Sequence, residues 1–150
     1  MDKRNYVEYV EGIYVGYRFY ETRFIDNTTG QCDEVAYEQT VQYPFGYGLS
    51  YTSFEQSIED FSVDKGIVTM KVKVSNTGDA AGKDVAQVYF TTPYTAGGIE
   101  KAHVVLAAFG KTGLLQPGES ETLTLTFAVD DMASYDEKGG GVLRVGGWDL

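Results

Sequence analysis

The stretch IVTMKVKVSN, residues Ile67–Asn76, alternates apolar and polar side chains along its whole length. The apolar side chains share one parity: Val68, Met70, Val72 and Val74. A period of two is typical of a β-strand that buries one face and exposes the other. The sequence therefore predicts a strand here, ended by the turn residues Asn-Thr-Gly-Asp at positions 76–79.

Three further segments towards the C-terminus are also typical of strands. They are DVAQVYFTTPY (84–94), HVVLAAFGKTGLL (103–115) and ESETLTLTF (119–127), and turn residues such as Pro117-Gly118 separate them. The middle segment is apolar without clean alternation, whereas the last places Leu125 and Phe127 on one face and Thr124 on the other. Short strands at this spacing predict an all-β fold, an antiparallel β-sandwich with Val72 and Leu125 in its core.

The residues before these strands differ from them in composition. Nine of the twelve tyrosines lie at or before Tyr51, whereas Val, Thr, Leu and Gly predominate from Phe54 onward. Gly12 and Gly16 each cost a helix about 1 kcal/mol relative to alanine, so we expect an extended stretch that leads into a brief helix around residues 16–22. Residues 24–42 are expected to be a polar connector without a core of its own.

Composition and charge exclude several classes of protein. Of the 150 residues, 43% are hydrophobic and 23% charged, which is typical of a globular protein and not of a disordered tail. The net charge is −10 and the isoelectric point is near 4.4, so we expect no nucleic-acid partner. Cys32 is the only cysteine, which excludes an internal disulfide. No apolar run is long enough to span a membrane, and the charged start MDKRNYVEYVE is unlike a secretory signal, which slightly favours a cytoplasmic location.

Two strings that precede the strands resemble the C-terminal region of glycoside hydrolase family 3, the β-glucosidase family. They are YVEGIYVGYRFYET (9–22) and YPFGYGLSYTSFE (43–55), of which the second is the more specific. The segments VSNTGDAAGKDVAQVYF (74–90), LAAFGKTGLLQPGESETLTLTF (106–127) and MASYDE (132–137) follow the same family pattern. The resemblance therefore extends over nearly the whole chain.

This resemblance implies a division of the chain into three parts. Residues 1–24 are expected to be the C-terminal remnant of the second, α/β catalytic domain, residues 25–53 a linker, and residues 54–150 an immunoglobulin-like or fibronectin type III-like β-sandwich. It also implies that the longer protein is a retaining, exo-acting β-glucosidase-like enzyme. That enzyme would hydrolyse the O-glycosyl bonds of β-linked glucosides, or of xylosides, and would need no metal or organic cofactor.

The catalytic residues of the family are expected to lie outside this chain. The nucleophilic aspartate and the acid/base glutamate belong to family segments that this sequence lacks, so no catalytic, substrate-binding or metal-ligating residue is assigned. Neighbouring carboxylates occur at Glu8 and Glu11, Asp33 and Glu34, Glu59 and Asp60, and Asp130 and Asp131. Each pair lies in a polar stretch, where solvated surface is the simpler interpretation. His103, the only histidine, and Cys32, which has no cationic neighbour, do not make up a catalytic pair or a zinc site.

The aromatic side chains before Phe54 are the candidate functional residues. In the family this segment packs between the catalytic domain and the sandwich, so interdomain packing is expected for Tyr14, Tyr17, Arg18, Phe19, Tyr43, Phe45, Tyr47 and Tyr51. Tyr9 and Tyr20 are expected to bury their rings in the same way, and Arg18 to hold the packing through a hydrogen-bonded or stacked guanidinium. The expected partners are the catalytic domains of the longer enzyme or a second copy of the chain.

A different class of function remains open at this point. Tyrosine rings can stack on sugars, so the chain could be an independent carbohydrate-binding or adhesion module. Such a module would carry an exposed aromatic platform on the sandwich face itself, where the visible strand residues are mostly Thr and Lys.

Overall fold

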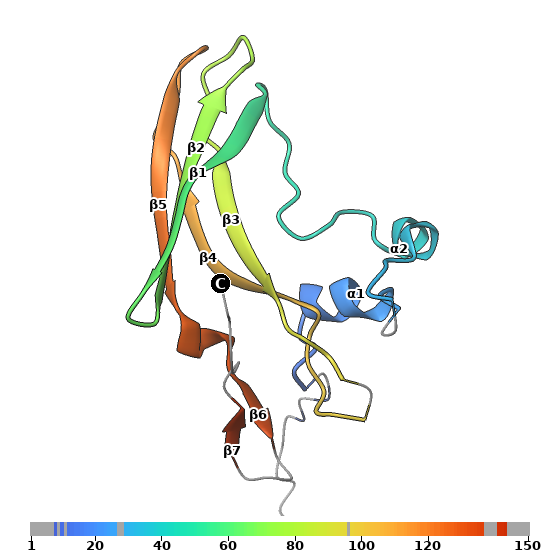
Figure 1. Cartoon of the computed structure of the whole chain (residues 1–150). Helices are drawn as coiled ribbons and strands as arrows, with labels where there is room; N and C mark the ends of the chain where they lie inside the picture. The colour runs from blue at the N-terminus through green and yellow to red at the C-terminus, as the bar shows by residue number, and fades with distance from the viewer. Residues whose placement is uncertain are drawn as a thin grey trace, which may run out of the picture.

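The computed structural model describes residues 8, 10, 12–26, 29–95, 97–136 and 141–143, the last three by their backbone alone. Two α-helices come first, α1 (Tyr17–Arg23) and α2 (Glu34–Thr40). The strands of the described part are β1 (Phe54–Asp64), β2 (Ile67–Asn76), β3 (Val85–Thr91), β4 (Val104–Lys111), β5 (Ser120–Ala128), β6 (Ser134–Asp136) and β7 (Gly141–Leu143). A 3-10 helix, η1 (Val129–Met132), connects β5 to β6. In Figure 1 the five long strands stand together and both α-helices lie to one side of them.

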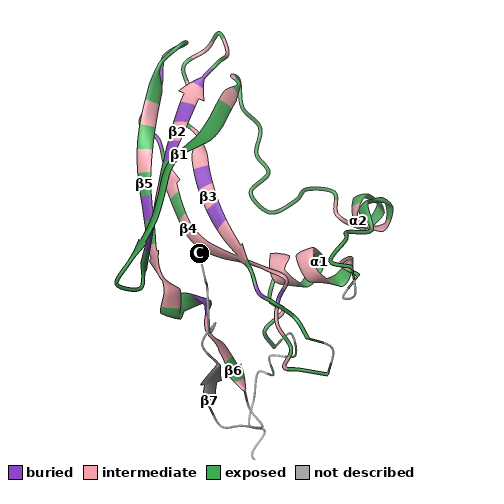
Figure 2. Ribbon diagram, viewed as in Figure 1, coloured by how far each residue is buried: buried purple, intermediate pink, exposed green. Residues whose placement is uncertain are grey.

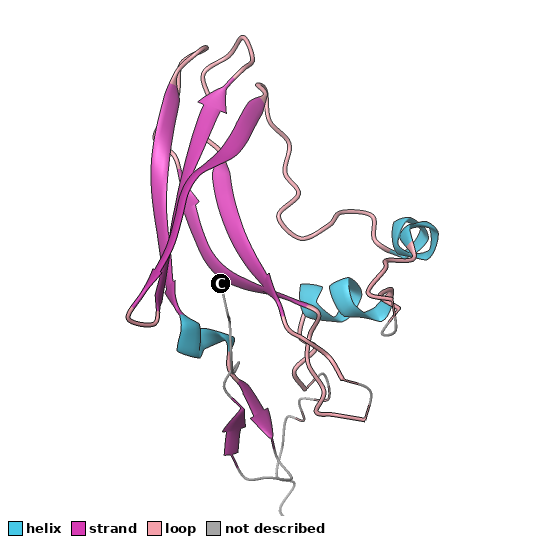
Figure 3. Ribbon diagram, viewed as in Figure 1, coloured by secondary structure: helices cyan, strands magenta, loops and turns pink. Residues whose placement is uncertain are grey.

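The long strands form two antiparallel sheets. One sheet has the order β1-β2-β5, and the other pairs β3 with β4. β2 is central in its sheet, because Val72 lies opposite Ile58 of β1 and Leu123 of β5. Figure 3 shows the long strands gathered together, with the two α-helices and the loop that follows them to one side. The predicted all-β antiparallel sandwich is therefore confirmed.

The core lies between the two sheets. Its buried members are Val72, Val74 and Leu125 from the first sheet, Ala86 and Val88 from β3, and Leu115 from the loop before β5. Figure 2 shows these buried positions as purple bands on β2 and β3. Leu125 is 6% exposed whereas Thr124 is exposed, so the predicted register of this strand is confirmed.

Two features of β1 set the geometry of its sheet. Lys65 and Gly66 form the turn to β2 with φ of 48° and 77°, the left-handed values that a type I′ hairpin turn requires. Further back, the register shifts between Ile58 and Asp60, so Glu59 is an extra residue on β1. Because of this bulge, Phe61 is the next residue after Ile58 on the same face of the sheet. The apolar residues of β1 therefore do not alternate strictly, and a period of two does not identify the strand.

Asn76 fixes the opposite end of β2. Its side chain is 1% exposed, and Nδ2 donates to the carbonyls of Ala80 (2.8 Å) and Leu115 (2.9 Å). Its Oδ1 accepts from the Thr52 hydroxyl (2.7 Å) and from the amide of Gly78 (3.1 Å). A Cβ on Gly78 would lie 2.3 Å from Oγ1 of Thr52, so this position has no room for a side chain. The predicted Asn-Thr-Gly-Asp turn thus fastens the end of the linker to the sandwich.

Two polar segments outside the strands predicted above contain regular structure, the first of them within the expected connector. α2 lies within residues 24–42 and begins where Oδ1 of Asp33 accepts a hydrogen bond from the amide of Ala36 (3.1 Å). The segment DDMASYDEKGGG (130–141) includes β6, which pairs with β7. Residues 144–150 lie outside the described residues.

Candidate functional site: the aromatic surface of the linker

Helix α1 lies against β4. The hydroxyl of Tyr17 accepts a hydrogen bond from the amide of Leu106 in β4 (2.8 Å). The hydroxyl of Thr22 accepts another from the amide of His103, just before β4 (2.9 Å). Gly16, with φ of 60°, makes the turn by which the chain enters the helix. The N-terminal helix is therefore held to the sandwich by specific bonds to backbone.

The ring of Tyr17 is enclosed by two other rings. It stacks on Phe45 of the linker, with centroids 4.2 Å apart and 17° between the planes. It also meets Tyr89 of β3 edge to face at 6.3 Å. Aromatic pairs of this geometry contribute about 0.5–1.5 kcal/mol each beyond their buried area. Tyr17 thus connects α1, the linker and the second sheet.

Two further tyrosines are bound to carboxylates. The Tyr14 hydroxyl donates to Oε2 of Glu100 (2.5 Å), and the Tyr37 hydroxyl on α2 donates to Oε1 of Glu21 on α1 (2.6 Å). Burial, and then these hydrogen bonds, raise the pKa of Tyr14 and of Tyr37 to about 12. The ring of Tyr37 also meets the edge of Phe24 at 5.8 Å. The two helices are therefore joined to each other, and α1 is joined to β4 as well.

The linker touches the sandwich at a tight turn. The amide of Tyr47 donates to the carbonyl of Pro44 (3.0 Å), and Gly46 between them has φ of 85°. A Cβ on Gly46 would lie 2.6 Å from Oε1 of Gln87 on β3. Tyr43 and Tyr47 lie on either side of this turn, with ring centroids 5.0 Å apart. Glycine is required here both by the backbone conformation and by the approach of β3.

Large apolar side chains are exposed along the same region. We call them the aromatic surface; its members are Phe19, Tyr20, Tyr43, Phe45, Tyr47, Leu49 and Tyr51. Leu49 is 92% exposed and Tyr51 fully so, and residues 42–51 of the linker are all exposed, which Figure 2 shows as a green stretch before β1. Apolar groups gathered on one segment of a soluble protein mark a contact surface.

The expected packing residues thus fall into two groups. Tyr14 and Tyr17 are bound to other residues of this chain. The side chains of the aromatic surface are exposed to solvent. Arg18 is half-buried, and its guanidinium makes no hydrogen bond or ion pair with any described residue. The guanidinium of Arg23, which sequence reasoning did not single out, lies 5.6 Å from the ring centroids of Phe19 and Phe24. Tyr9 lies outside the described residues.

The neighbouring carboxylates support the fold. Asp33 caps α2, and Oδ2 of Asp60 pairs with Nζ of Lys71 on the next strand at 3.4 Å. Oε2 of Glu59 accepts from the Thr122 hydroxyl (3.0 Å), and Oδ2 of Asp131 accepts from the amide of Ala128 (3.1 Å). Glu11, one of the pair with Glu8, lies outside the described residues. In the part described, no group of three or more His, Cys, Asp or Glu is arranged to hold a metal ion, and the helices are too short and too polar to span a membrane.

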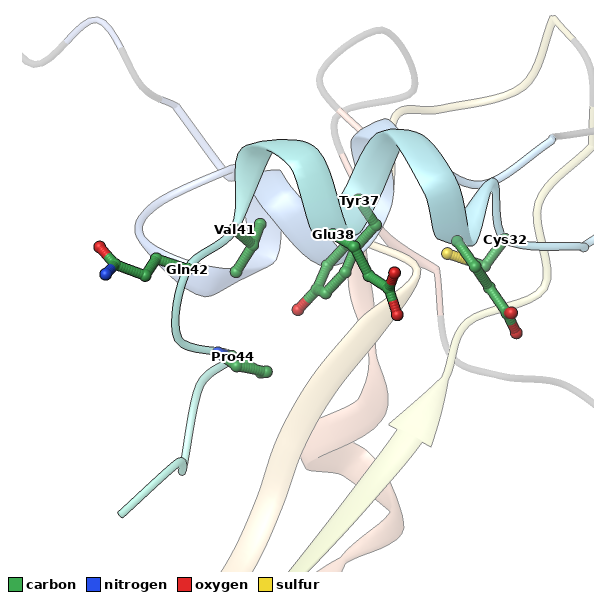
Figure 4. Close-up of a pocket in the computed structure, with 7 residues that line it drawn as sticks. Cys32, Tyr37, Glu38, Val41, Gln42 and Pro44 are labelled. Atoms are coloured by element: carbon green, nitrogen blue, oxygen red, sulfur yellow. The ribbon is translucent and has the colours of Figure 1, made fainter. Parts of the chain in front are cut away.

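A cavity of about 410 Å³ lies beside α2 (Figure 4). It is lined by Cys32, Glu34, Tyr37, Glu38, Val41, Gln42 and Pro44. Glu34 and Glu38 are both exposed, so they lack the desolvation by which glycosidases distinguish an acid from a nucleophile. Desolvation, and then the carboxylates of Glu34, Glu21 and Asp33, raise the pKa of the Cys32 thiol. A raised pKa disfavours the thiolate, so this cavity lacks an activated nucleophile.

The sequence matches known proteins along most of its length. Residues 84–150 match the model of the fibronectin type III-like domain. A β-glucosidase of Ruminococcus albus is 45% identical over 131 residues, which cover 87% of this chain and 12% of that protein. β-Glucosidase A of Butyrivibrio fibrisolvens is 38% identical over 152 residues, covering 90% of this chain and 16% of that protein. The chain therefore spans only a small part of these relatives.

Solved structures give the same result. The structure of a β-glucosidase from Paenibacillus barengoltzii has a TM-score of 0.72 and 42% identity, covering 88% of this chain and 13% of its own. That of β-glucosidase 3B from Thermotoga neapolitana in complex with glucose has a TM-score of 0.65 and 42% identity, covering 85% of this chain and 16% of its own. The similarity extends beyond residues 84–150, because these structures cover 88% and 85% of the chain.

Proposed function

This chain corresponds to a C-terminal part of a glycoside hydrolase family 3 protein of the β-glucosidase type, and we propose that it is the non-catalytic region that packs against the catalytic domains of that longer enzyme. In this proposal residues 54–150 are the fibronectin type III-like domain, residues 25–53 the linker and residues 1–24 the end of the second catalytic domain. The longer protein would be a retaining exo-β-glucosidase acting on β-linked glucosides or xylosides.

The aromatic surface carries the proposal. Tyr17 is bound to the sandwich, so the helix and linker have a defined position on it. Tyr47 and Tyr51, on the same linker, are 56% and 102% exposed. Burying an aromatic ring of this kind contributes about 1.5–3 kcal/mol, and aromatic residues are enriched where proteins meet. A segment fixed on one side and uncovered on the other is suited to lie between two domains.

The distribution of exposed rings supports this role over that of an independent sugar-binding module. A binding module would gather its rings on one sandwich face. The exposed rings on the described strands are instead single residues, Phe61 on β1, Phe109 on β4 and Tyr135 on β6. The linker, by contrast, carries Tyr43, Phe45, Tyr47 and Tyr51 within nine residues of one another.

A chimera tests the proposal. The matching region of the Thermotoga neapolitana β-glucosidase 3B is replaced by this chain, and activity on an aryl β-glucoside and thermal stability are measured. We expect the chimera to be active and Tyr51→Ser to destabilise it by about 1.5–3 kcal/mol, because a ring buried at the domain interface is lost. The same substitution in the chain alone should leave its unfolding midpoint unchanged, since Tyr51 is fully exposed there.

Tyr135→Ser serves as the matched control. Tyr135 is an exposed tyrosine on β6, away from the linker, and its loss should affect the chimera and the isolated chain alike. If Tyr51→Ser has no more effect than Tyr135→Ser in an active chimera, the interdomain role is refuted. Retention of the isolated chain on an insoluble β-glucan, lost in Tyr51→Ser, would favour the binding module instead.

A further inference from the structure

The cavity beside α2 has a mainly apolar floor. The helical residues that line it, from Glu34 to Val41, are three or four positions apart, so they share one face of α2 and its C-terminal end. Tyr37 and Val41 on this face are half-buried, and Pro44 of the linker completes the apolar part of the lining (Figure 4). The cavity therefore offers packing surface to the apolar stem of an incoming side chain.

The rim of the same cavity is negatively charged. Glu34 and Glu38 are four positions apart on the lining face, where like charges repel each other. Neither carboxylate makes an ion pair with any residue that the structure describes, and no described residue of the lining is basic. The pKa of the Cys32 thiol, at the edge of the cavity, is raised by desolvation and then by carboxylates, of which Glu34 acts most strongly. A positive charge placed between Glu34 and Glu38 would relieve their repulsion.

The cavity adjoins the aromatic surface. Pro44 lies between Tyr43 and Phe45 in the sequence, and its carbonyl accepts a hydrogen bond from the amide of Tyr47 in the same turn (3.0 Å). One wall of the cavity is thus the beginning of the turn that presents these three rings. A partner that covers the rings also reaches the cavity, and under the proposed function that partner is the catalytic part of the longer enzyme.

We propose that the cavity beside α2 is the docking site for a long basic side chain, an arginine or a lysine, of the catalytic domains; the source of that side chain rests on the proposed function. Its aliphatic stem packs on Tyr37, Val41 and Pro44. Its charged end lies between the carboxylates of Glu34 and Glu38. Charge pairs at the rim of an interface select the partner and its orientation more than they add affinity. The cavity therefore aligns the linker on the catalytic domains, while the aromatic surface supplies the buried area.

Charge disfavours a second copy of the chain as the source of the basic side chain. Each copy has a net charge of −10, so two copies repel each other at long range. The cavity itself adds two carboxylates to the surface that a second copy would have to approach. A basic group on a different domain is therefore the occupant that the charges favour.

The full chain alone tests the cavity without the catalytic domains. The probe is Nα-acetyl-arginine amide, and Nα-acetyl-citrulline amide is its control, because citrulline has nearly the same shape and no charge. At low salt we expect the arginine probe to shift the NMR signals of the amides of residues 32–42 in a saturable way, and the citrulline probe to shift them far less. Glu38→Gln should weaken the response, whereas Glu55→Gln, which removes an exposed acid of β1 outside the cavity, should not. Absence of saturation, equal responses to the two probes, or equal weakening by the two substitutions would overturn the proposal.

The chimera with Thermotoga neapolitana β-glucosidase 3B tests the source of the basic side chain. Glu38→Gln should lower the unfolding midpoint of the active chimera, and the loss should shrink at high salt. In the isolated chain the same substitution should not lower the midpoint, because it removes the repulsion from Glu34. Glu55→Gln should act alike in both proteins.

The outcomes separate this inference from the proposed function. If Tyr51→Ser destabilises the active chimera and Glu38→Gln does not, the interdomain role stands and the basic side chain is refuted. If sedimentation shows that the isolated chain forms a dimer and that Glu38→Gln abolishes it, a second copy fills the cavity and the proposal is overturned as well.

Discussion

The ring of Tyr17 lies on the ring of Phe45, 4.2 Å away, while the Tyr17 hydroxyl accepts a hydrogen bond from the amide of Leu106. The first contact joins α1 to the linker and the second joins α1 to β4. Tyr17, together with the Thr22 hydroxyl that accepts a hydrogen bond from the amide of His103, therefore determines where α1 lies on the sandwich.

Removal of the Tyr17 hydroxyl should destabilise the chain. Tyr17→Phe keeps the ring stack but leaves the half-buried amide of Leu106 without its acceptor, which costs about 1 kcal/mol. Tyr20→Phe is the control, because Tyr20 is 41% exposed and its hydroxyl makes no hydrogen bond with the described residues. Urea unfolding followed by circular dichroism measures both. Equal stability of the two variants would mean that α1 is not held at β4 in solution.

The register of β5 can be tested by neighbouring substitutions. Leu125→Ala removes a side chain that is 6% exposed and should cost about 2–5 kcal/mol. Thr124→Ala changes the exposed face of the same strand and should cost about 0.5 kcal/mol or less. Denaturant titration of each variant gives the comparison. Similar losses would place β5 one residue out of register.

Replacement of Asn76 by aspartate should strongly lower the stability of the fold. Asn76→Asp replaces an amide that donates to the carbonyls of Ala80 and Leu115 by a group that only accepts. Leaving buried partners unsatisfied costs about 1–3 kcal/mol for each group, so we expect a strong loss of stability at neutral pH. Gln116→Glu makes the same chemical change at an exposed position and should be nearly neutral. A mild effect of Asn76→Asp in thermal unfolding would contradict the network.

Two tyrosines should ionise late. The pKa values of Tyr14 and Tyr37 are raised to about 12, first by burial and then by hydrogen bonds to Glu100 and Glu21. Since an unfolded tyrosine ionises near pH 10, the stabilisation from the neutral hydroxyls is complete below about pH 10 and is lost as the pH rises through about 12. Tyrosinate absorbance of the native chain should show these two late groups, beside Tyr89, whose pKa burial also raises.

Substitution of each tyrosine shows which residue gives which late ionisation. Tyr14→Phe should remove one of them, and Tyr37→Phe the other. Glu100→Gln should bring the Tyr14 ionisation only part of the way back towards pH 10, because burial is the larger cause. A native titration without any late component would mean that neither hydroxyl is bound to its carboxylate in solution.

The isolated chain should not hydrolyse glycosides. It lacks the family's catalytic segments, and Glu34 and Glu38, which line the cavity beside α2, are both exposed. Incubation with aryl β-glucoside and aryl β-xyloside from acidic to neutral pH should give no release above buffer. Turnover that survives repurification and disappears in both Glu34→Gln and Glu38→Gln would place a catalytic pair in this cavity.

The strands whose inward and outward faces could be predicted from the sequence are those whose two faces have different surroundings. β2 and β5 have the core on one side and water on the other, so their residues alternate strictly. β4 lacks clean alternation because α1 also contacts it. β1 was not predicted as a strand, because the bulge at Glu59 changes the parity of its apolar residues in mid-strand.

The candidate site was predictable only in part. The tyrosine-rich strings pointed to the linker, but the partners of Tyr17 lie far along the chain, and nothing local identifies the amide of Leu106 as one of them. The stacked guanidinium belongs to Arg23 because α1 places it one turn beyond Phe19. α2 had a usable signal in Asp33 followed by Glu34, the pattern of a helix start, although seven residues give almost no periodicity to detect.

The bond between Tyr17 and Leu106 closes a loop of 89 residues, and this separation sets an order of events during folding. On the ribosome Tyr17 emerges long before β4 exists, so the aromatic segment stays uncovered while most of the domain is made. The β1–β2 hairpin needs only its two-residue turn and can form early. Attachment of α1 must then follow assembly of the second sheet, and losing it should speed unfolding rather than slow folding. A chaperone that binds exposed aromatic residues would therefore meet this segment before the second sheet of the sandwich is complete.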